Sequence, residues 1–297
     1  MSIEVLIITK DEEANLPHTL ASLQGWTQRI WVVDSGSSDR TVEIARAAGC
    51  EVRVQEWQGY AKQKNWAFDT LPLTADWVLI VDADEAVTPA LRDALVSRSN
   101  RSSEANDPIG YYINRHFVFL GGVIWHSGYY PSWNIRFFRR GRARYEDRLV
   151  HEHLVVDGPV GYIAEDLIHF DRRPLEHHIS KHNRYSTLEA QAIFAQEQAP
   201  GVKLEARLFG DGPARRRWFK RHIYPRLPCK FLLRFAYMYF LKCGFLDGLT
   251  GLRFALFITS YELHIELKLI ELRMQSREAC QRSSRERTPP VQGGSLD

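Results

Sequence analysis

This 297-residue sequence lacks paired cysteines, a strong charge of one sign and long apolar runs. The four cysteines show no CxxC spacing, which fits neither a disulfide framework nor a thiolate metal site and indicates a reducing compartment. The apolar run at residues 3–8 has no basic residue before it and acidic residues soon after it. We therefore expect it to be a first strand and not a signal peptide.

The composition that is present belongs to a folded, soluble protein. Apolar residues make up 44% of the chain and charged residues 25%, which excludes wholesale disorder and a collagen-like structure. The length permits one large domain or two smaller ones. The net charge is only +3, but the basic surplus is local, because nine Lys or Arg residues and no Asp or Glu lie between Pro213 and Leu246.

Short apolar runs alternate with helix-like stretches in the first third of the chain. We expect strands at residues 3–9, 29–34, 51–55 and 77–82, and helices between them at 15–24, 39–48 and 61–71. A further helix is expected to start at Thr88, with Pro89 in the favoured first position. This rhythm predicts a mostly parallel, Rossmann-like α/β sheet flanked by helices.

The remainder of the chain continues the sheet and then changes character. Strands are expected at 110–120, 133–139, 155–163 and 167–171, followed by a long helix at 175–198. Residues 215–274 read as helical, aromatic and basic, whereas 275–297 lack the apolar residues that would order them. We predict an α/β domain over 1–171, a helical, basic and amphipathic region over 172–274, and a disordered tail over 275–297.

Carboxylates follow three of the expected strands. Glu12 lies just after the first strand, Asp34 ends the second, and Asp82-Ala83-Asp84 ends the fourth. The carboxyl ends of parallel strands share one edge of a sheet, where ligands bind. Clustered carboxylates repel one another unless a cation balances them. Because Asp82 and Asp84 can face the same way, we expect them to address one hard divalent cation, Mg²⁺ or Mn²⁺, although a solvated strand exit is the alternative.

Other polar residues near these strand ends suit a bound nucleotide. Asp34 can accept the N3 proton of uracil, with Thr9 holding the rest of the nucleoside, or it can simply cap the Ser/Gly turn that follows it. Lys10, Lys62 and Lys64 are candidate partners for a diphosphate, although lysines on helices are usually solvated.

Several segments together resemble a known family. TKDEEANL, VVDSGSSDRT, QKNWA and VLIVDADE are similar to the motifs of family 2 glycosyltransferases of the GT-A fold, and this resemblance covers roughly residues 2–171. The segments FLGGVIWHSGYYPSWNIRFFRR, LVHE and GFLDGLTG resemble the branch that adds a hexose to the lipopolysaccharide inner core. The α/β domain is then expected to be a GT-A catalytic domain.

The resemblance assigns roles to individual residues. Asp34 matches the uracil-binding Asp, Asp84 the metal-binding Asp, and Glu152 the general base. His169 matches a histidine that often completes the metal site. Asp11 stands where the family more often has Asn. The set expected to bind the nucleotide sugar is Thr9, Glu12, Asp34, Lys62 and Asp82, with Asp84 and His169 as the metal ligands.

Glycosyl transfer from a nucleoside diphosphate needs one base and no general acid. The diphosphate leaves readily once its charge is neutralised, so a single carboxylate that deprotonates the acceptor hydroxyl is sufficient for inversion. Glu152, between two histidines, is the expected base, with Glu146 and Asp147 as rivals. Trp125, Tyr129, Tyr130 and Trp133 can either stack on acceptor sugars or pack in the core.

The basic and aromatic C-terminal region suits an anionic membrane surface. Lys and Arg residues at 215–230 precede large apolar residues at 231–241, a mixture that suits an anionic bilayer. The uncharged runs in this region are far shorter than the ~20 residues of a membrane-spanning helix. Nucleic acid is disfavoured because the region carries no sequence-reading motif and is too apolar. We expect a cytoplasmic protein that is peripheral on the inner face of the cytoplasmic membrane.

These patterns combine into one predicted function. The chain is expected to be an inverting, metal-dependent glycosyltransferase that moves a hexose from a UDP-sugar to a hydroxyl of a lipid-linked saccharide, such as the lipopolysaccharide core. The alternatives are a sugar-phosphate nucleotidyltransferase, against which the lack of a Gly-rich phosphate loop after the first strand argues, and a non-catalytic, membrane-associated nucleotide-binding scaffold.

Overall fold

The computed structural model describes residues 2–101, 106–146, 153–198 and 230–286. The chain divides into two compact units, one formed by Met1–Arg173 and Cys243–Gly251 and the other by Pro174–Lys242 and Leu252–Asp297. The first unit therefore includes a short segment from the C-terminal part of the chain. The domain boundary predicted at 171 remains a prediction.

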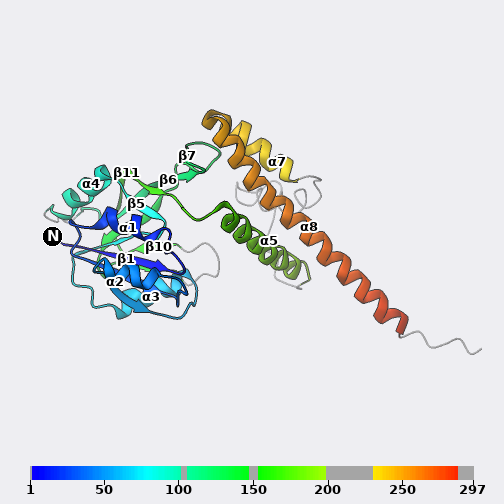
Figure 1. Cartoon of the computed structure of the whole chain (residues 1–297), viewed down its shortest axis with the longest axis horizontal. Coiled ribbons are helices and arrows are strands. Elements are labelled where there is room, and N and C mark those ends of the chain that lie inside the picture. Colours follow the sequence, from blue (N-terminus) through cyan, green and yellow to red (C-terminus); the bar gives the residue numbers. More distant parts are fainter. Residues whose placement is uncertain (1, 102–105, 147–152, 199–229, 287–297) are drawn as a thin grey trace, which may run out of the picture. The chain divides into compact units, whose positions relative to one another are not determined.

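The first unit is a mixed α/β structure (Figure 1). Its strands are β1 (Ile3–Thr9), β2 (Arg29–Asp34), β3 (Glu51–Val54), β4 (Trp77–Ile80), β5 (Glu85–Val87), β6 (Gly110–Phe119), β7 (Gly122–Ile124), β8 (Asn134–Arg139), β9 (Ala143–Tyr145), β10 (Leu154–Val156) and β11 (Val160–His169). Its helices are α1 (Leu16–Leu23), α2 (Thr41–Ala47), α3 (Tyr60–Thr70), α4 (Pro89–Ser99) and the 3-10 turn Gly244–Asp247.

The main sheet has the strand order β3-β2-β1-β4-β8-β6-β11-β5, with β7 paired to β6. Strands β3, β2, β1 and β4 are parallel, as are β6 and β11, whereas β8 is antiparallel to both of its neighbours. The β1–β2 register pairs Thr9 with Asp34, so these two strand ends lie side by side. The predicted α/β class with a Rossmann-like parallel sheet and flanking helices is confirmed.

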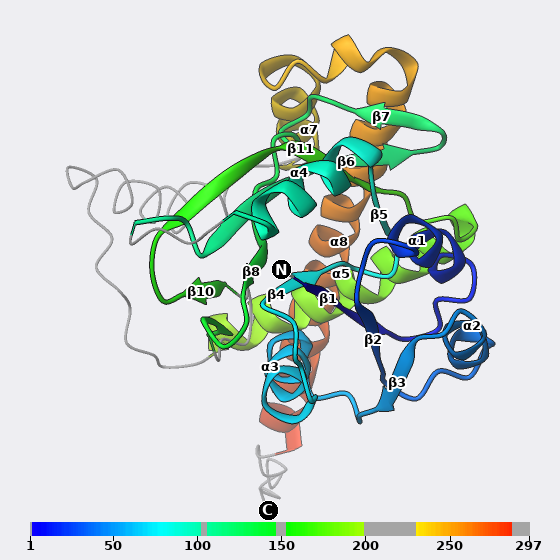
Figure 2. The ribbon, with the colours of Figure 1, turned by 90° about the vertical axis from the view of Figure 1, so that its left-hand side faces the viewer.

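Helices cover both faces of this sheet. Leu16, Leu20, Ala45 and Leu91 from α1, α2 and α4 pack on one face with the buried side chains of β1 and β4. The other face is covered by α3 and by the β9–β10 hairpin. Figure 2 shows α3 on the opposite side of β1 and β2 from α1. Pro89 occupies the first position of α4, as predicted, and Thr88 caps this helix, because its side chain accepts a hydrogen bond from the Leu91 backbone N–H.

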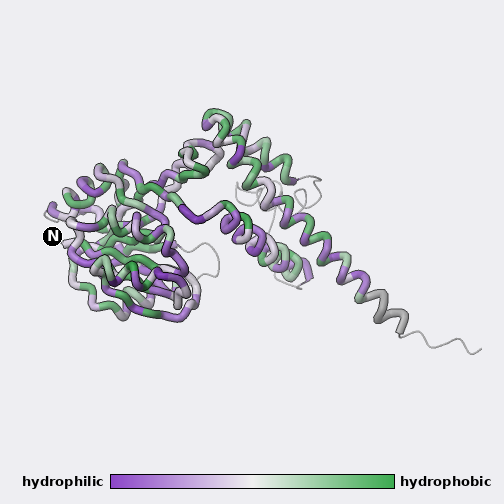
Figure 3. Tube along the Cα trace, in the orientation of Figure 1, coloured by the Kyte–Doolittle hydropathy of each residue, from purple (hydrophilic) through white to green (hydrophobic). Residues whose placement is uncertain are grey.

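The second unit is helical. It contains α5 (Leu175–Gln198), α7 (Lys230–Ala236), a π-helical turn at Tyr237–Leu241 and most of α8 (Gly248–Glu286). Ala190 of α5 packs with Ile265 and Leu269 of α8, and Arg273 pairs with Glu197 at 2.5 Å. Figure 3 shows alternating hydrophobic and hydrophilic bands along α8, which is the pattern of a helix with one packed face.

Two expectations differ from the structure. The sequence after residue 274 was expected to be disordered, but α8 continues to Glu286, because a helix already nucleated by packing extends readily through residues with good helix propensity. The helix predicted over 39–48 begins only at Thr41, with Arg40 as the cap residue. The Asp39 carboxylate still accepts a hydrogen bond from the Thr41 backbone N–H, at 3.0 Å.

The core at the centre of the sheet gives a test of the fold. Phe137 is fully buried and stacks on Trp77 with 4.4 Å between ring centroids. We expect Phe137→Ala to lower the free energy of unfolding by about 3–5 kcal/mol, because the substitution leaves a cavity. The matched control, Phe245→Ala, removes a side chain that is 46% exposed and is expected to change stability far less. Urea unfolding followed by circular dichroism measures both, and equal losses would contradict this core assignment.

Candidate functional site

A buried ion-pair network holds the end of β4. Arg136 of β8 places Nη2 2.8 Å from Oδ2 of Asp82 and 3.0 Å from Oε1 of Glu85. Lys64 of α3 lies 3.8 Å from the other Asp82 oxygen, and Arg115 of β6 lies 3.4 Å from Glu85. The Glu85 carboxylate also accepts a hydrogen bond from the backbone N–H of Asp82, at 2.9 Å. Four elements thus converge on one strand end.

These cations determine the charge state of Asp82. Burial alone would raise the pKa of its carboxyl, but Arg136, Lys64 and Arg115 hold that pKa well below the usual range. The three cations face the carboxylates of Asp82 and Glu85, and Asp84, which interacts with both, adds a third carboxylate to the site. Arg115 is the most accessible of the three, with 34% of its side chain exposed. Arg115 is therefore the cation of this network that a bound anion would reach most readily.

Asp84 has a different environment, only two residues further along the chain. Burial raises the pKa of its carboxyl, and Asp82, Glu85 and Asp171 raise it further against the opposing effect of His169. Oδ1 of Asp84 lies 3.4 Å from Nδ1 of His169, at the end of β11. Among the described residues, this buried nitrogen has no hydrogen-bond partner. Asp84 and His169, the two predicted metal ligands, are thus neighbours.

The chemistry of this pair fits a divalent cation. An oxygen and a nitrogen donor lie together, and a cation there would relieve the repulsion among the surrounding carboxylates. Within residues 2–101, 106–146, 153–198 and 230–286, no group of three or more His, Cys, Asp or Glu side chains is arranged to hold a metal ion. Ligand oxygens, such as those of a diphosphate, would have to complete the coordination shell.

Glu12 belongs to a second charged group beside this pair. Its carboxylate accepts a hydrogen bond from Asn15 at 2.8 Å and lies 3.1 Å from Nη1 of Arg173. Arg173 also binds Asp171 at 2.5 Å. Burial raises the pKa of Glu12 to about 7 because desolvation outweighs the contacts with Asn15 and Arg173. This carboxyl can therefore bind or release a proton near neutral pH.

Asp34 and Thr9 meet at the ends of β2 and β1. The Thr9 hydroxyl donates to Oδ1 of Asp34 at 3.0 Å, and the Asp34 side chain also accepts hydrogen bonds from the backbone N–H groups of Gly36 and Ser37 and from the Ser37 hydroxyl. Asp34 therefore caps the Ser/Gly turn. With about four acceptor positions already in use, the carboxylate would have to exchange one of these partners to bind uracil.

The other expected residues fall in different places. Lys62 lies on the exposed face of α3, and the lysine of this helix that contacts the described cluster is Lys64. Glu152, the expected base, and its rival Asp147 lie outside the described residues. Glu146 is described, and its backbone N–H donates to the carbonyl of His153 at 3.0 Å.

Sequence reasoning missed the basic half of the site. Arg115, Arg136 and Arg173 lie 31 or more residues beyond Asp84, and no role was predicted for any of them, although Arg136 falls within the segment FLGGVIWHSGYYPSWNIRFFRR. The available signal was weak: Arg136 interrupts the apolar strand around Phe137, and a charge inside such a strand requires a buried partner. Glu85 gave a similar signal, because it directly follows Asp84 and begins a buried strand.

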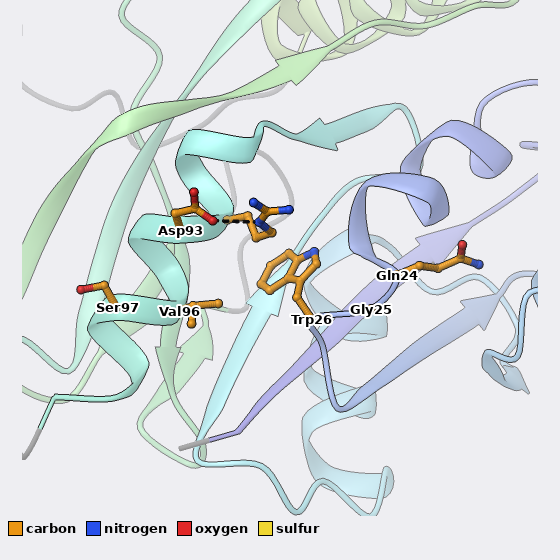
Figure 4. Close-up of a pocket in the computed structure, with 7 residues that line it drawn as sticks. Gln24, Gly25, Trp26, Asp93, Val96 and Ser97 are labelled. Carbon is orange, nitrogen blue, oxygen red and sulfur yellow. Dashed lines mark hydrogen bonds and ion pairs between the residues drawn. The ribbon is translucent and has the colours of Figure 1, made fainter.

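Pockets also occur at the opposite edge of the sheet. Figure 4 shows one lined by Trp26, Gln24 and Gly25 from the loop after α1 and by Asp93, Val96 and Ser97 from α4. A neighbouring pocket includes Ser2, Ile3 and Gln28. These residues lie near the amino ends of β1 and β2, whereas the charged cluster lies at the carboxyl ends. The pockets are therefore separate from the predicted site.

The chain matches a known protein family over half its length. The family described as Glycosyl transferase family 2 matches residues 4–154. The lipopolysaccharide core biosynthesis glycosyltransferase LpsC of Rhizobium meliloti is 30% identical over 279 residues, which cover 89% of this chain and 92% of the relative. An uncharacterized glycosyltransferase of Rickettsia typhi, RT0209, is 29% identical over 65% of this chain and 68% of the relative.

Solved structures resemble the chain more distantly. Residues 1–349 of S. aureus TarS in complex with UDP match at 24% identity and a TM-score of 0.32, over 41% of this chain and 38% of that one. Glucosyl-3-phosphoglycerate synthase from Mycobacterium tuberculosis, in complex with Mn²⁺, UDP and phosphoglyceric acid, matches at 16% identity and a TM-score of 0.39, over 59% of this chain and 72% of that one.

The raised pKa of Glu12 predicts a pH dependence of stability. Between its ordinary pKa of 4.5 and about 7, the folded protein retains a proton that the unfolded chain has lost, so stability should fall as pH rises through this window. In wild type, the free energy of unfolding should fall by an amount on the order of 2 kcal/mol between pH 5 and pH 8 because of Glu12, and Glu12→Gln should abolish this decrease. Urea unfolding of metal-free wild type and variant at both pH values measures the effect. Parallel pH profiles would contradict the assignment, and Glu13→Gln, at an exposed neighbour, is the control.

Proposed function

This chain belongs to glycosyltransferase family 2, and from that premise we propose that it transfers a hexose from a UDP-sugar to a hydroxyl of a lipid-linked saccharide, with inversion and with a divalent metal. The observation that carries the proposal is the adjacency of Asp84 and His169 beside the cationic Asp82 cluster. The similarity to LpsC suggests the lipopolysaccharide core as the acceptor. Family membership favours glycosyl transfer over nucleotidyl transfer or a non-catalytic scaffold.

The charged residues suggest how the donor is held. Asp84 and His169 would bind Mg²⁺ or Mn²⁺, which when bound neutralises charge on the leaving diphosphate. Arg115, which is 34% exposed, would pair with a phosphate oxygen of the donor. Asp82 is already engaged by Arg136 and Lys64, so it would contact the ribose or metal-bound water and not the metal directly. Thr9, Glu12, Asp34 and Lys62 complete the proposed nucleotide-sugar site.

A single proton transfer completes the proposed reaction. The Glu152 carboxylate takes the proton from the acceptor hydroxyl as that oxygen forms its bond to the anomeric carbon. The bond from this carbon to the diphosphate breaks on the opposite side, and UDP carries away the bonding electrons. Attack opposite the leaving group inverts the anomeric configuration, so one carboxylate is sufficient.

The second unit suits the surface of a membrane. Leu232, Leu233, Tyr237, Phe240 and Leu241 are all strongly exposed, Leu241 at 76%, and Lys230, Arg234 and Lys242 lie among them without any acidic residue. Hydrophobic colour predominates over α7 in Figure 3. Large apolar side chains mixed with cations fit an anionic bilayer surface. Within the described residues, no helix has the length and apolarity to cross a membrane.

The transferase reaction is tested by the products it releases. Purified protein, Mn²⁺, a UDP-hexose and lipopolysaccharide acceptor should release free UDP, and Glu152→Gln should reduce this release by a factor of about 10² or more, because general-base catalysis is lost. UDP binding by this variant should remain as in wild type. Acceptor-dependent release at the wild-type rate would refute Glu152 as the base. Release of pyrophosphate from UTP and a hexose 1-phosphate, with no acceptor-dependent release of UDP from UDP-hexose, would instead indicate a nucleotidyltransferase.

The metal assignment has its own test. In the presence of UDP, Mn²⁺ should raise the unfolding temperature of wild type, because a ligand that binds only the folded state stabilises it. Asp84→Asn and His169→Ala should lose this increase. Asp69→Asn is the matched control, because it alters an exposed carboxylate paired with Arg144 on the surface. The assignment fails if Asp82→Asn abolishes the Mn²⁺ effect while Asp84→Asn retains it.

Membrane association is tested with lipid vesicles. Wild type should sediment with vesicles that contain phosphatidylglycerol. The double variant Phe240→Glu with Leu241→Glu should bind these vesicles at least about tenfold more weakly, because anionic lipids repel the two added carboxylates and because two apolar side chains are no longer buried in the bilayer. The control changes two exposed apolar residues of α5, Ile179→Glu with Leu188→Glu. Equal loss in both double variants, or none in either, would argue against this surface.

A further inference from the structure

A group of aromatic and ionisable side chains lies outside the proposed donor site. His116 of β6 places Nε2 2.7 Å from Oδ2 of Asp166, and the Tyr130 hydroxyl donates to the same oxygen at 3.2 Å. Trp125 contacts both rings edge-on, with its centroid 4.1 Å from that of His116 and 5.3 Å from that of Tyr130. Asp166 lies where the β6–β11 register shifts between Ile163 and Leu167. All four side chains belong to the first unit.

The loop that carries Trp125 and Tyr130 is tied down at both ends. At one end, the carboxylate of Asp247 accepts a hydrogen bond from the His126 backbone N–H at 2.9 Å. The same carboxylate lies 2.6 Å from Nδ1 of the His126 ring. At the other end, the Asn114 side chain accepts a hydrogen bond from the Ser132 backbone N–H. The loop is thereby ordered in advance, which lowers the entropy cost of binding a ligand.

This fixed loop leaves Trp125 45% exposed. An indole held open to solvent is a large apolar surface, and the Tyr130 hydroxyl, His116 and Asp166 add hydrogen-bonding groups next to it. The Tyr130 hydroxyl donates to Asp166, and burial and this carboxylate raise the pKa of Tyr130 above its ordinary value. An apolar platform with a few convergent polar groups is suited to a saccharide, which presents both C–H faces and hydroxyls.

The neighbours of this group indicate which saccharide it binds. Arg115 and Phe117 flank His116 on β6; Arg115 contacts Glu85, and the Phe117 ring lies 5.2 Å from that of His169. Successive side chains of a strand point to opposite faces, so His116 faces away from Arg115 and Phe117. The loop nevertheless borders the donor site, because the ring of Tyr129, next to Tyr130, lies 6.0 Å from that of Phe117. On its other side, Asp247 lies between Leu246 and Leu249, whose side chains are 60% and 59% exposed. A saccharide here would lie beside both the donor and an apolar turn.

From this arrangement we propose that Trp125, Tyr130, His116 and Asp166 form the subsite for the carbohydrate head of the lipid-linked acceptor, and that Asp247 is the positioning residue that holds it beside the apolar turn. This inference rests on the proposed function. It assigns acceptor recognition to residues that do not contact the donor cluster, so donor and acceptor binding should be separable by mutation.

The test uses deacylated lipopolysaccharide core oligosaccharide as the probe, with full-length protein, UDP-hexose and Mn²⁺. Trp125→Ala should raise the acceptor KM about tenfold, equivalent to about 1.4 kcal/mol of binding. Its UDP-hexose KM, and UDP-hexose hydrolysis without acceptor, should be unchanged. Trp125→Phe should recover part of the acceptor affinity. Trp26→Ala, in the pocket of Figure 4 at the opposite edge of the sheet, is the matched control and should leave the acceptor KM unchanged.

Asp247→Asn tests the positioning role. It removes the charge that holds His126 but touches neither sugar, so acceptor KM should rise while donor KM stays constant. Calorimetric titration of each protein with the oligosaccharide in the presence of UDP reports binding directly, and thermal unfolding identifies any variant that fails to fold. An unchanged acceptor affinity in folded Trp125→Ala, or no binding of the oligosaccharide by wild type, overturns the subsite. Absence of UDP binding and donor turnover in wild type would instead overturn the proposed function.

Discussion

The arrangement of the site depends on the buried guanidinium of Arg136. This group is only 7% exposed and bridges Asp82, after β4, and Glu85, at the start of β5. Without it, two carboxylates would remain near one another with much less compensating charge, which is costly in a protein interior. Arg136 itself lies on β8, the antiparallel strand next to β4. Sheet pairing therefore brings together the charges that the strand ends require.

The same network separates two aspartates that look equivalent in the sequence. Asp82 is surrounded by cations, which lower the pKa of its carboxyl, whereas Asp84 is surrounded by carboxylates and a histidine, and its pKa is raised. Neighbouring acids whose environments shift their pKa values apart are suited to different tasks. This difference supports Asp84 as the metal ligand and Asp82 as a residue that the arginines hold in place.

The GFLDGLTG segment has a physical explanation in the first unit. A Cβ atom on Gly251 would lie 2.0 Å from the carbonyl oxygen of Gly244, and one on Gly122 would lie 2.6 Å from Oγ1 of Thr250. Glycine is needed wherever the backbone approaches this closely. The close approach places Asp247 against His126, which links a C-terminal turn to the loop bearing Trp125. The GFLDGLTG segment thus permits a contact between Asp247 and His126, which are 121 residues apart in the sequence.

The sequence pattern by itself determined the α/β class and the strand ends that carry acids, whereas only the resemblance to a known family indicated that Asp84 and His169 act together. Apolar periodicity and the shared edge of parallel strands depend on local pattern, which can be read without coordinates. The tertiary structure decided which cations pair with the acids at the end of β4, namely Arg115, Arg136 and Lys64. It also showed that Asp34 caps its own turn and that Asp247 reaches His126. Such contacts depend on strand order and on side chains distant in sequence, which no local pattern encodes.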